Sequence, residues 1–169
     1  MHIPSSLLTT TVTAAALALL AALTAAAVPL EAQNQTSQLG HAIVHNNCMF
    51  PIYLWYVGST VSEQQNMTYG AIYTETFRSD PYTGGVDIKI TTVPNGLATS
   101  APQTIFAYNL VADRVSYDLS DVFGDPFCGT RVVLDGELTD IVWEMGVPPA
   151  GGSIARNQRA AVDLVLTVC

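Results

Sequence analysis

Short stretches in which apolar and polar residues alternate recur along most of this 169-residue chain. Residues 86–91 (VDIKIT), 106–110, 115–119 and 162–168 (VDLVLTV) each place their apolar side chains on one face of an extended segment, which is the period of a half-buried strand. Residues 52–57 (IYLWYV) are apolar throughout, which predicts a strand covered on both faces. Gly, Pro, Asn and Asp separate these runs. The pattern predicts an all-β domain of two packed antiparallel sheets, a β-sandwich.

The chain begins with 27 residues that contain no charged side chain, apart from a titratable His2, and that end in the small residues TAAA. This is typical of a secretory signal peptide with a small-x-small cleavage site. We therefore predict a signal peptide over residues 1–27, a flexible segment over 28–39 and one domain over 40–169. An uncleaved membrane anchor is the alternative, which the absence of a flanking basic stop signal disfavours. The expected location is extracellular, without membrane association after cleavage.

All 14 acidic and all six basic residues follow the predicted signal peptide, so the mature chain has a formal charge of −8 at pH 7. This charge would repel a nucleic acid or an anionic membrane, and we expect neither as a partner. A polysaccharide of the cell wall is the partner class that we expect. The sequence predicts no cofactor and leaves the oligomeric state open.

Three cysteines follow the predicted signal peptide, and cysteines of exported proteins commonly pair. Cys48 follows the first strand region and Cys169 is the final residue, so a disulfide between them would tie the two ends of the domain together. We predict this pair. Cys128 would then be a buried or partly buried free thiol, with dimer formation or pairing with Cys48 as the alternatives.

Two Asn-x-Thr triplets make Asn34 and Asn66 candidate glycosylation sites in an exported protein. Asn66 lies in a polar stretch, residues 62–66, that is typical of an exposed loop.

The segments GHAIVHNNCMFPIYLWYVG, YDLSDVFGDPF, IVWEMGVPPAGGS and DLVLTVC resemble the Blastomyces yeast-phase-specific family of fungal secreted proteins, also described as antigenic thaumatin-like proteins. The resemblance covers residues 40–169 and is most specific at 123–127 and 146–149. It implies a small thaumatin-like β-sandwich, a fungal source and a secreted or surface location. In larger thaumatin-like proteins a cysteine of the N-terminal strand pairs with the last cysteine, so the resemblance also implies a bond between Cys48 and Cys169.

Larger thaumatin-like proteins carry an acidic cleft of one Arg, one Glu and several Asp, which in some members is linked to β-glucan binding or hydrolysis. The resemblance places Ala107 where the Glu would stand and Phe123 where one Asp would stand, and residues 88–92 contain no Arg. It therefore implies a largely dismantled cleft and a protein that is not an enzyme. A degenerate β-glucanase, an antifungal protein and a host-interacting surface protein are the alternatives.

Three carboxylates, Asp118, Asp121 and Asp125, lie close enough in sequence to gather at one rim of a binding groove. A glycosidase would need two of them across that groove, one with a raised pKa. The simpler interpretation is a turn in which short acidic side chains bond to their own backbone.

Aromatic side chains near turns are candidates for stacking on sugar rings, and Tyr69, Tyr73 and Tyr82 are the three that we select. The two histidines of the domain, His41 and His45, accompany no serine-hydrolase motif and are too few for a structural metal site, so we predict none.

Overall fold

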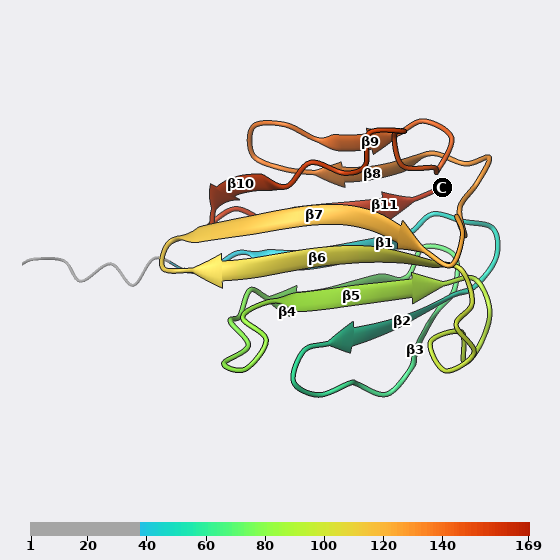
Figure 1. Cartoon of the computed structure of the whole chain (residues 1–169), viewed down its shortest axis with the longest axis horizontal. Helices are drawn as coiled ribbons and strands as arrows, with labels where there is room; N and C mark the ends of the chain where they lie inside the picture. Colours follow the sequence, from blue (N-terminus) through green and yellow to red (C-terminus); the bar gives the residue numbers. More distant parts are fainter. Residues whose placement is uncertain (1–37) are drawn as a thin grey trace, which may run out of the picture. The chain divides into compact units, whose positions relative to one another are not determined.

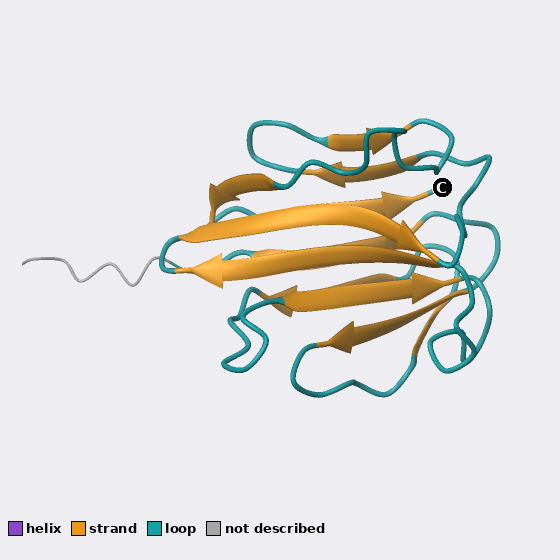
Figure 2. Ribbon diagram, in the orientation of Figure 1, coloured by secondary structure: helices purple, strands orange, loops and turns teal. Residues whose placement is uncertain are grey.

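A computed structural model describes residues 38–169 of the chain. The predicted signal peptide, the sequon at Asn34 and most of the segment 28–39 fall outside the described residues. Within the described part, eleven strands form two sheets packed face to face, and there is no helix (Figures 1 and 2). The prediction of an all-β sandwich is confirmed. No helix that could span a membrane is found in residues 38–169.

The first sheet has five strands, and its order places the first and last strands of the domain side by side. In spatial order these strands are β4 (Ile72–Thr76), β1 (His41–Asn46), β11 (Leu164–Val168), β8 (Val132–Asp135) and β9 (Ile141–Trp143). The β1–β11 pair is parallel, whereas the other pairs of this sheet are antiparallel. The prediction of purely antiparallel sheets is therefore wrong for this pair. Alternation within a strand reports which face is buried and carries no information about the direction of its neighbour.

The second sheet has six strands, all antiparallel to their neighbours, and it faces the viewer in Figure 1. In spatial order the strands are β10 (Arg156–Arg159), β7 (Arg114–Val122), β6 (Gln103–Val111), β5 (Val86–Thr91), β2 (Ile52–Val57) and β3 (Gln65–Met67). One face of this sheet packs on the five-stranded sheet, and the other is the outer face of the molecule.

The core lies between the two sheets and follows the predicted alternation closely. The apolar residues of 86–91 and 115–119 are buried, and in 162–168 burial begins at Leu164 because Val162 still belongs to the preceding turn. Trp55 points outward from β2 and is only 6% exposed, whereas Tyr53 and Val57 are half-buried. The second face of β2 is thus covered only in part. Two loop residues, Phe77 and Phe127, complete the core and carry no strand pattern that could have predicted them.

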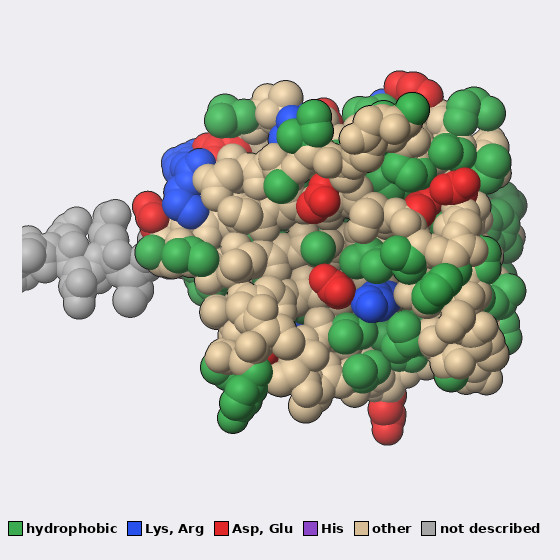
Figure 3. Space-filling model, in the orientation of Figure 1, with side chains coloured by type: hydrophobic (Ala, Val, Ile, Leu, Met, Phe, Trp, Pro, Cys, Tyr) green, Lys and Arg blue, Asp and Glu red, His purple; other side chains and the backbone are tan. Residues whose placement is uncertain are grey.

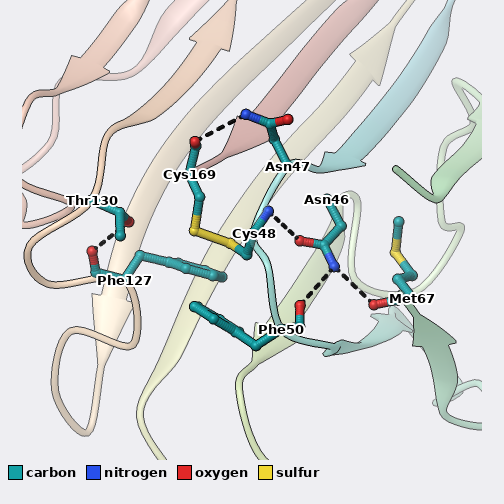
Figure 4. The surroundings of a disulfide bond; sticks show 8 residues. All are labelled: Asn46, Asn47, Cys48, Phe50, Met67, Phe127, Thr130 and Cys169. Atoms are coloured by element: carbon teal, nitrogen blue, oxygen red, sulfur yellow. Dashed lines mark hydrogen bonds between the residues drawn. A yellow bond between two sulfur atoms is a disulfide. The ribbon is translucent and has the colours of Figure 1, made fainter. Parts of the chain in front are cut away.

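The predicted disulfide joins Cys48 to Cys169, with their Cα atoms 4.9 Å apart (Figure 4). Its position follows from the parallel β1–β11 pair. Asn46 stands opposite Val168 in that pair, so both strands end at the same edge of the sheet and both cysteines emerge there. An antiparallel pairing would have sent the two cysteines to opposite ends of the sandwich. The bond is confirmed.

A fully buried amide beside the disulfide connects three segments of the chain (Figure 4). Asn46 Oδ1 accepts from the Cys48 amide at 2.9 Å, while Asn46 Nδ2 donates to the carbonyls of Phe50 at 3.1 Å and Met67 at 2.8 Å. Since buried polar groups need partners, this one side chain fixes how the β1–β2 loop and β3 meet the end of β1.

Cys128 is a free thiol, but it is exposed, so the prediction of a buried or partly buried thiol is wrong in its burial. In the loop that carries Cys128, the preceding Phe127 points its side chain into the core, and the Cys128 thiol faces solvent. The same loop is held by the β9–β10 loop, where the Gly129 amide donates to Met145 O at 2.9 Å. A Cβ on Gly146 would lie 2.0 Å from Phe127 O, so only glycine allows this contact. The two segments in which the family resemblance is most specific, 123–127 and 146–149, therefore belong to two loops that pack against each other.

Candidate functional site

The outer face of the six-stranded sheet carries a shallow depression of about 300 Å³ over β5, β6 and β7. Alternation along the strands turns Asp87, Asn109, Ser116 and Asp118 outward, and Ala107 forms part of the floor between them. Figure 3 views this face and shows a few acidic and basic side chains on a surface otherwise made of uncharged side chains and backbone. The depression thus combines a small apolar floor with amide, hydroxyl and carboxylate groups.

An adjacent hollow extends the depression toward β2. It is lined by Val57 and Gly58 and shares Thr83, Gly85 and Asp87 with the first. Together the two hollows form a groove that runs across the strands, from the end of β2 to the start of β7. We call this the outer groove.

One buried carboxylate organises the loops at the rim of the outer groove. Asp80 Oδ2 accepts from the backbone amide and the hydroxyl of Ser59 at 2.8 and 2.7 Å, and Asp80 Oδ1 accepts from the amides of Tyr82 and Thr83 at 3.0 and 2.9 Å. These hydrogen bonds, with those from Ser59 and Thr83 the largest, hold the pKa of Asp80 well below its usual range. A Cβ on Gly58 would lie 2.6 Å from Asp80 Oδ2, so glycine is required beside this carboxylate.

The three candidate tyrosines lie in different surroundings. Tyr82 is 86% exposed and sits in the loop that lines the outer groove with Thr83. Tyr69 is 60% exposed but lies beside Gly70, whose amide donates to Asn46 O where β1 ends. The loop of Tyr82 instead follows Phe77, whose amide donates to Gly40 O where β1 begins. Tyr69 and Tyr82 are therefore at opposite ends of the sandwich.

Tyr73, the third candidate, is half-buried in a polar network. Its hydroxyl donates to Glu75 Oε2 at 3.1 Å, and the Tyr108 hydroxyl donates to Glu75 Oε1 at 2.7 Å. Burial, together with the Glu75 carboxylate, raises the pKa of Tyr73 above its ordinary value. Arg78 Nε lies 3.5 Å from Glu75 Oε2 of the same carboxylate. The Arg78 guanidinium also lies over the Tyr56 ring, with its Cζ atom 4.9 Å from the ring centroid. The Tyr73 hydroxyl is therefore committed to this network.

The three candidate carboxylates do not line one rim. Asp118 faces the outer groove and accepts a hydrogen bond from the Ser153 hydroxyl. Asp121, three residues along the same strand, faces the interior and accepts from Thr104 Oγ1 at 2.6 Å. Burial raises the pKa of Asp121 to about 7, and the neighbouring Asp125 carboxylate adds to the rise. Asp121 thus lies near Asp125, and Asp118 stands apart from it on the other face of β7.

The remaining sequence candidates have these positions. Asn66 is exposed and lies in the edge strand β3 rather than in a loop, where its Oδ1 accepts from Gln64 Nε2 at 2.6 Å. Its glycosylation stays a prediction. His41 Nδ1 lies 2.9 Å from Asp163 Oδ1. No group of three side chains suited to holding a metal ion occurs among residues 38–169.

Sequence reasoning missed most of the outer groove. Asp87, Asn109 and Ser116 come from three strands and meet only through the strand register. The turn-rich sequence SDPYTGG at 79–85 was the available signal, since an Asp before Pro and Gly commonly accepts bonds from its own turn.

Two stacked sheets, with the domain's first and last strands adjacent and joined by a disulfide, define a small thaumatin-like protein. The chain belongs to the Blastomyces yeast-phase-specific protein family, whose model matches residues 29–169.

Two similar proteins are fungal. The chain is 32% identical over 130 residues to an antigenic thaumatin-like protein of Arthroderma benhamiae, covering 75% of this chain and 65% of that protein. It is 31% identical over 125 residues to the secreted thaumatin-like protein calA of Emericella nidulans, covering 70% of each. The chain thus spans about two thirds of the length of these relatives.

A solved structure shares the fold. The crystal structure of the protein elicitor MoHrip2 from Magnaporthe oryzae superposes with a TM-score of 0.63 at 23% identity, covering 77% of this chain and 98% of the other.

Proposed function

We propose that this protein acts outside a fungal cell, at the cell surface or in the medium, and binds a neutral wall polysaccharide in the outer groove without cleaving it. The family and the names of the two relatives, one antigenic and one secreted, support the extracellular location. The single observation that carries the binding proposal is the outer groove, which has hydrogen-bonding side chains along its length and an exposed Tyr82 next to its lining residue Thr83.

The chemistry of the groove suits sugar hydroxyls. Asn109 is exposed and offers both a donor and an acceptor, and no other described residue uses its side chain. Asp87 and Asp118 add acceptors, and an open aromatic ring such as Tyr82 provides an apolar face for a sugar ring. The two carboxylates would repel an anionic polymer, so a neutral one such as glucan, chitin or mannan is the expected ligand.

The position of the protonatable carboxyl supports binding without turnover. A glycosidase needs a general acid that still carries its proton and that faces the scissile bond. Asp121 has the raised pKa, about 7, but its side chain points into the sandwich and away from the groove. In the groove, Asp118 is bonded to Ser153 and Asp87 lies 3.9 Å from Lys89 Nζ.

Retention of the mature protein on insoluble β-1,3-glucan, chitin and mannan tests the proposal. We expect retention on at least one of them, weakened about tenfold in Tyr82→Ala, which corresponds to about 1.4 kcal/mol. Tyr69→Ala removes an exposed tyrosine at the other end of the sandwich and is the matched control, for which we expect no change. Equal losses in both variants would contradict the location of the site in the outer groove. No retention on any polymer would contradict the proposal and favour a host-interacting surface protein.

A reducing-sugar assay on β-1,3-glucan tests the absence of turnover. We expect no release above the background of a mock preparation. Release that disappears in Asp121→Ala would instead support a degenerate glucanase.

A further inference from the structure

A second cleft, of about 290 Å³, lies where the two sheets part at one side of the sandwich. Its walls include the edge strand β9 of the five-stranded sheet and the edge strand β10 of the six-stranded sheet, which lie on the same side of the molecule in Figure 1. The loop between these strands, through Ser153 and Ile154, covers part of it. We call this the edge cleft.

Two buried donors of the edge cleft have no acceptor among the described residues. Trp143 is 2% exposed, and its indole Nε1–H has no hydrogen-bond partner there. The Nε–H of Arg156, on the opposite wall, is buried and equally unpartnered. A buried donor without an acceptor costs roughly 1–3 kcal/mol, and more when it is charged. Two such donors in one cleft indicate that a ligand or solvent supplies the acceptors.

Arg156 is also unusual among the six basic residues, all of which lie in the described part of the chain. The other five each contact an acceptor: Arg114 bonds to Asn157, and the rest pair with a carboxylate, namely Arg78, Lys89, Arg131 and Arg159. Arg156 has no such partner among residues 38–169, in a chain with 14 acidic residues. A half-buried guanidinium without a carboxylate favours a ligand that brings one.

We propose that the edge cleft binds the carboxylate of a small ligand about the size of one sugar ring. A carboxylate carries two oxygens, which suits one indole donor and one guanidinium donor on facing walls. The volume, about 290 Å³, is just below the range for small-molecule sites, which run from about 300 to 1,000 Å³. Asp140 also lines the cleft and accepts from the Gly136 amide at 3.2 Å. Its negative charge repels that of the ligand, so we expect weak binding, with a Kd on the order of 1 mM.

The edge cleft is distinct from the outer groove, although one segment separates them. Ala155 lines the outer groove, and its neighbours Ile154 and Arg156 line the edge cleft. The two sites differ in charge, since Asp87 and Asp118 line the groove, whereas the cleft combines one aspartate, Asp140, with the unpaired Arg156. Failure of one site therefore leaves the other untouched, and the variants below do not alter the side chains of the groove.

The indole N–H resonance of Trp143 in a ¹⁵N-correlation spectrum reports on the cleft directly, and Trp143→Phe assigns it against Trp55. Titration of the mature protein with sodium glucuronate should shift this resonance saturably, whereas glucose at the same concentration should not. A parallel titration with sodium propionate shows which carboxylates the cleft accepts. A shift with both salts indicates that the cleft binds small carboxylates in general, and a shift with glucuronate alone indicates that it binds a sugar acid.

Arg156→Gln should weaken glucuronate binding at least tenfold, and Arg131→Gln, which removes an exposed arginine paired with Glu144 at 3.1 Å, should leave it unchanged. The same spectra show whether each variant is folded, and Arg156→Lys, which keeps the charge, should recover part of the affinity. The proposal is overturned if no saturable shift occurs up to about 20 mM salt, well above the expected Kd. Equal shifts with glucose, or equal binding by Arg156→Gln, also overturn it.

Discussion

Replacing Cys48 and Cys169 together by alanine should lower the free energy of unfolding by about 5 kcal/mol. The two residues are 121 positions apart, so the bond closes nearly the whole domain into one loop. The chain-entropy relation assigns such a loop about 16 cal/mol/K, which is about 4.9 kcal/mol at 25 °C. Typical domains have a total stability of about 5–15 kcal/mol, so the variant should lie close to the limit of folding.

The thermal midpoint should fall accordingly. Unfolding entropy is about 2.1 cal/mol/K per residue, which for the roughly 130 residues of this domain predicts a fall of roughly 15–20 °C. Urea unfolding followed by tryptophan fluorescence gives the free energy, and calorimetry gives the midpoint. Both are best measured in a Cys128→Ala background, because the exposed Cys128 thiol would otherwise attack the Cys48–Cys169 disulfide of the reference protein as it unfolds.

The reasoning also predicts the behaviour of a single variant. Cys169→Ala opens the same loop, so it should lose as much stability as the double variant, to within about 1 kcal/mol. A loss below about 2 kcal/mol in the double variant would show that the parallel β1–β11 pair already holds the two ends together in the unfolded ensemble, and it would refute the entropic argument.

Three further predictions concern single side chains. Asn46→Ala should lower the free energy of unfolding, measured by urea denaturation, by about 2–4 kcal/mol, because it leaves the buried Cys48 amide, the buried Met67 carbonyl and the partly buried Phe50 carbonyl without their partner. A loss below about 1 kcal/mol, on the order of one exposed hydrogen bond, would contradict this. The pKa of Asp121 is about 7 in the folded protein and about 3.9 in the unfolded chain. Between pH 3.9 and pH 7, roughly, the folded protein therefore keeps a proton on Asp121 that the unfolded chain has lost. The free energy of unfolding falls as the pH rises through this range. In urea unfolding measured from pH 4 to 8, Asp121→Asn should show a smaller fall of the free energy of unfolding with pH. At pH 8 the variant should be more stable than the wild type by about 1–3 kcal/mol. An unchanged dependence on pH would argue against the raised pKa of Asp121. Cys128 should react with iodoacetamide in the folded protein at nearly the rate of the denatured protein, and strong protection by folding would contradict its exposure.

Local pattern was sufficient for the strands whose faces are set by alternation. Residues 86–91 and 115–119 lie in strands with the predicted face buried. Burying one face of a strand requires an apolar residue at every second position, and the sequence shows this pattern directly. The disulfide could be predicted for a different reason, since Cys48 and Cys169 lie at the two ends of the domain and the family resemblance implies the same pair.

Long-range pairing was beyond the sequence pattern. The parallel neighbour of β1 is more than 100 residues away, and nothing in either strand records its direction. The outer groove depends on the same information, because Asp87, Asn109 and Ser116 meet only through the register of three strands. Packing in loops was also hidden, since the same turn buries Phe127 and exposes Cys128.

The binding of a neutral glycan in the outer groove is tested most directly by a crystal structure of the mature protein with an oligosaccharide of the polymer that retains it. The sugar should lie across β5, β6 and β7, with one ring against Tyr82 and hydroxyls bonded to Asn109 and Asp118. A sugar at the opposite end of the sandwich beside Tyr69, or none at saturating concentration, would contradict the account.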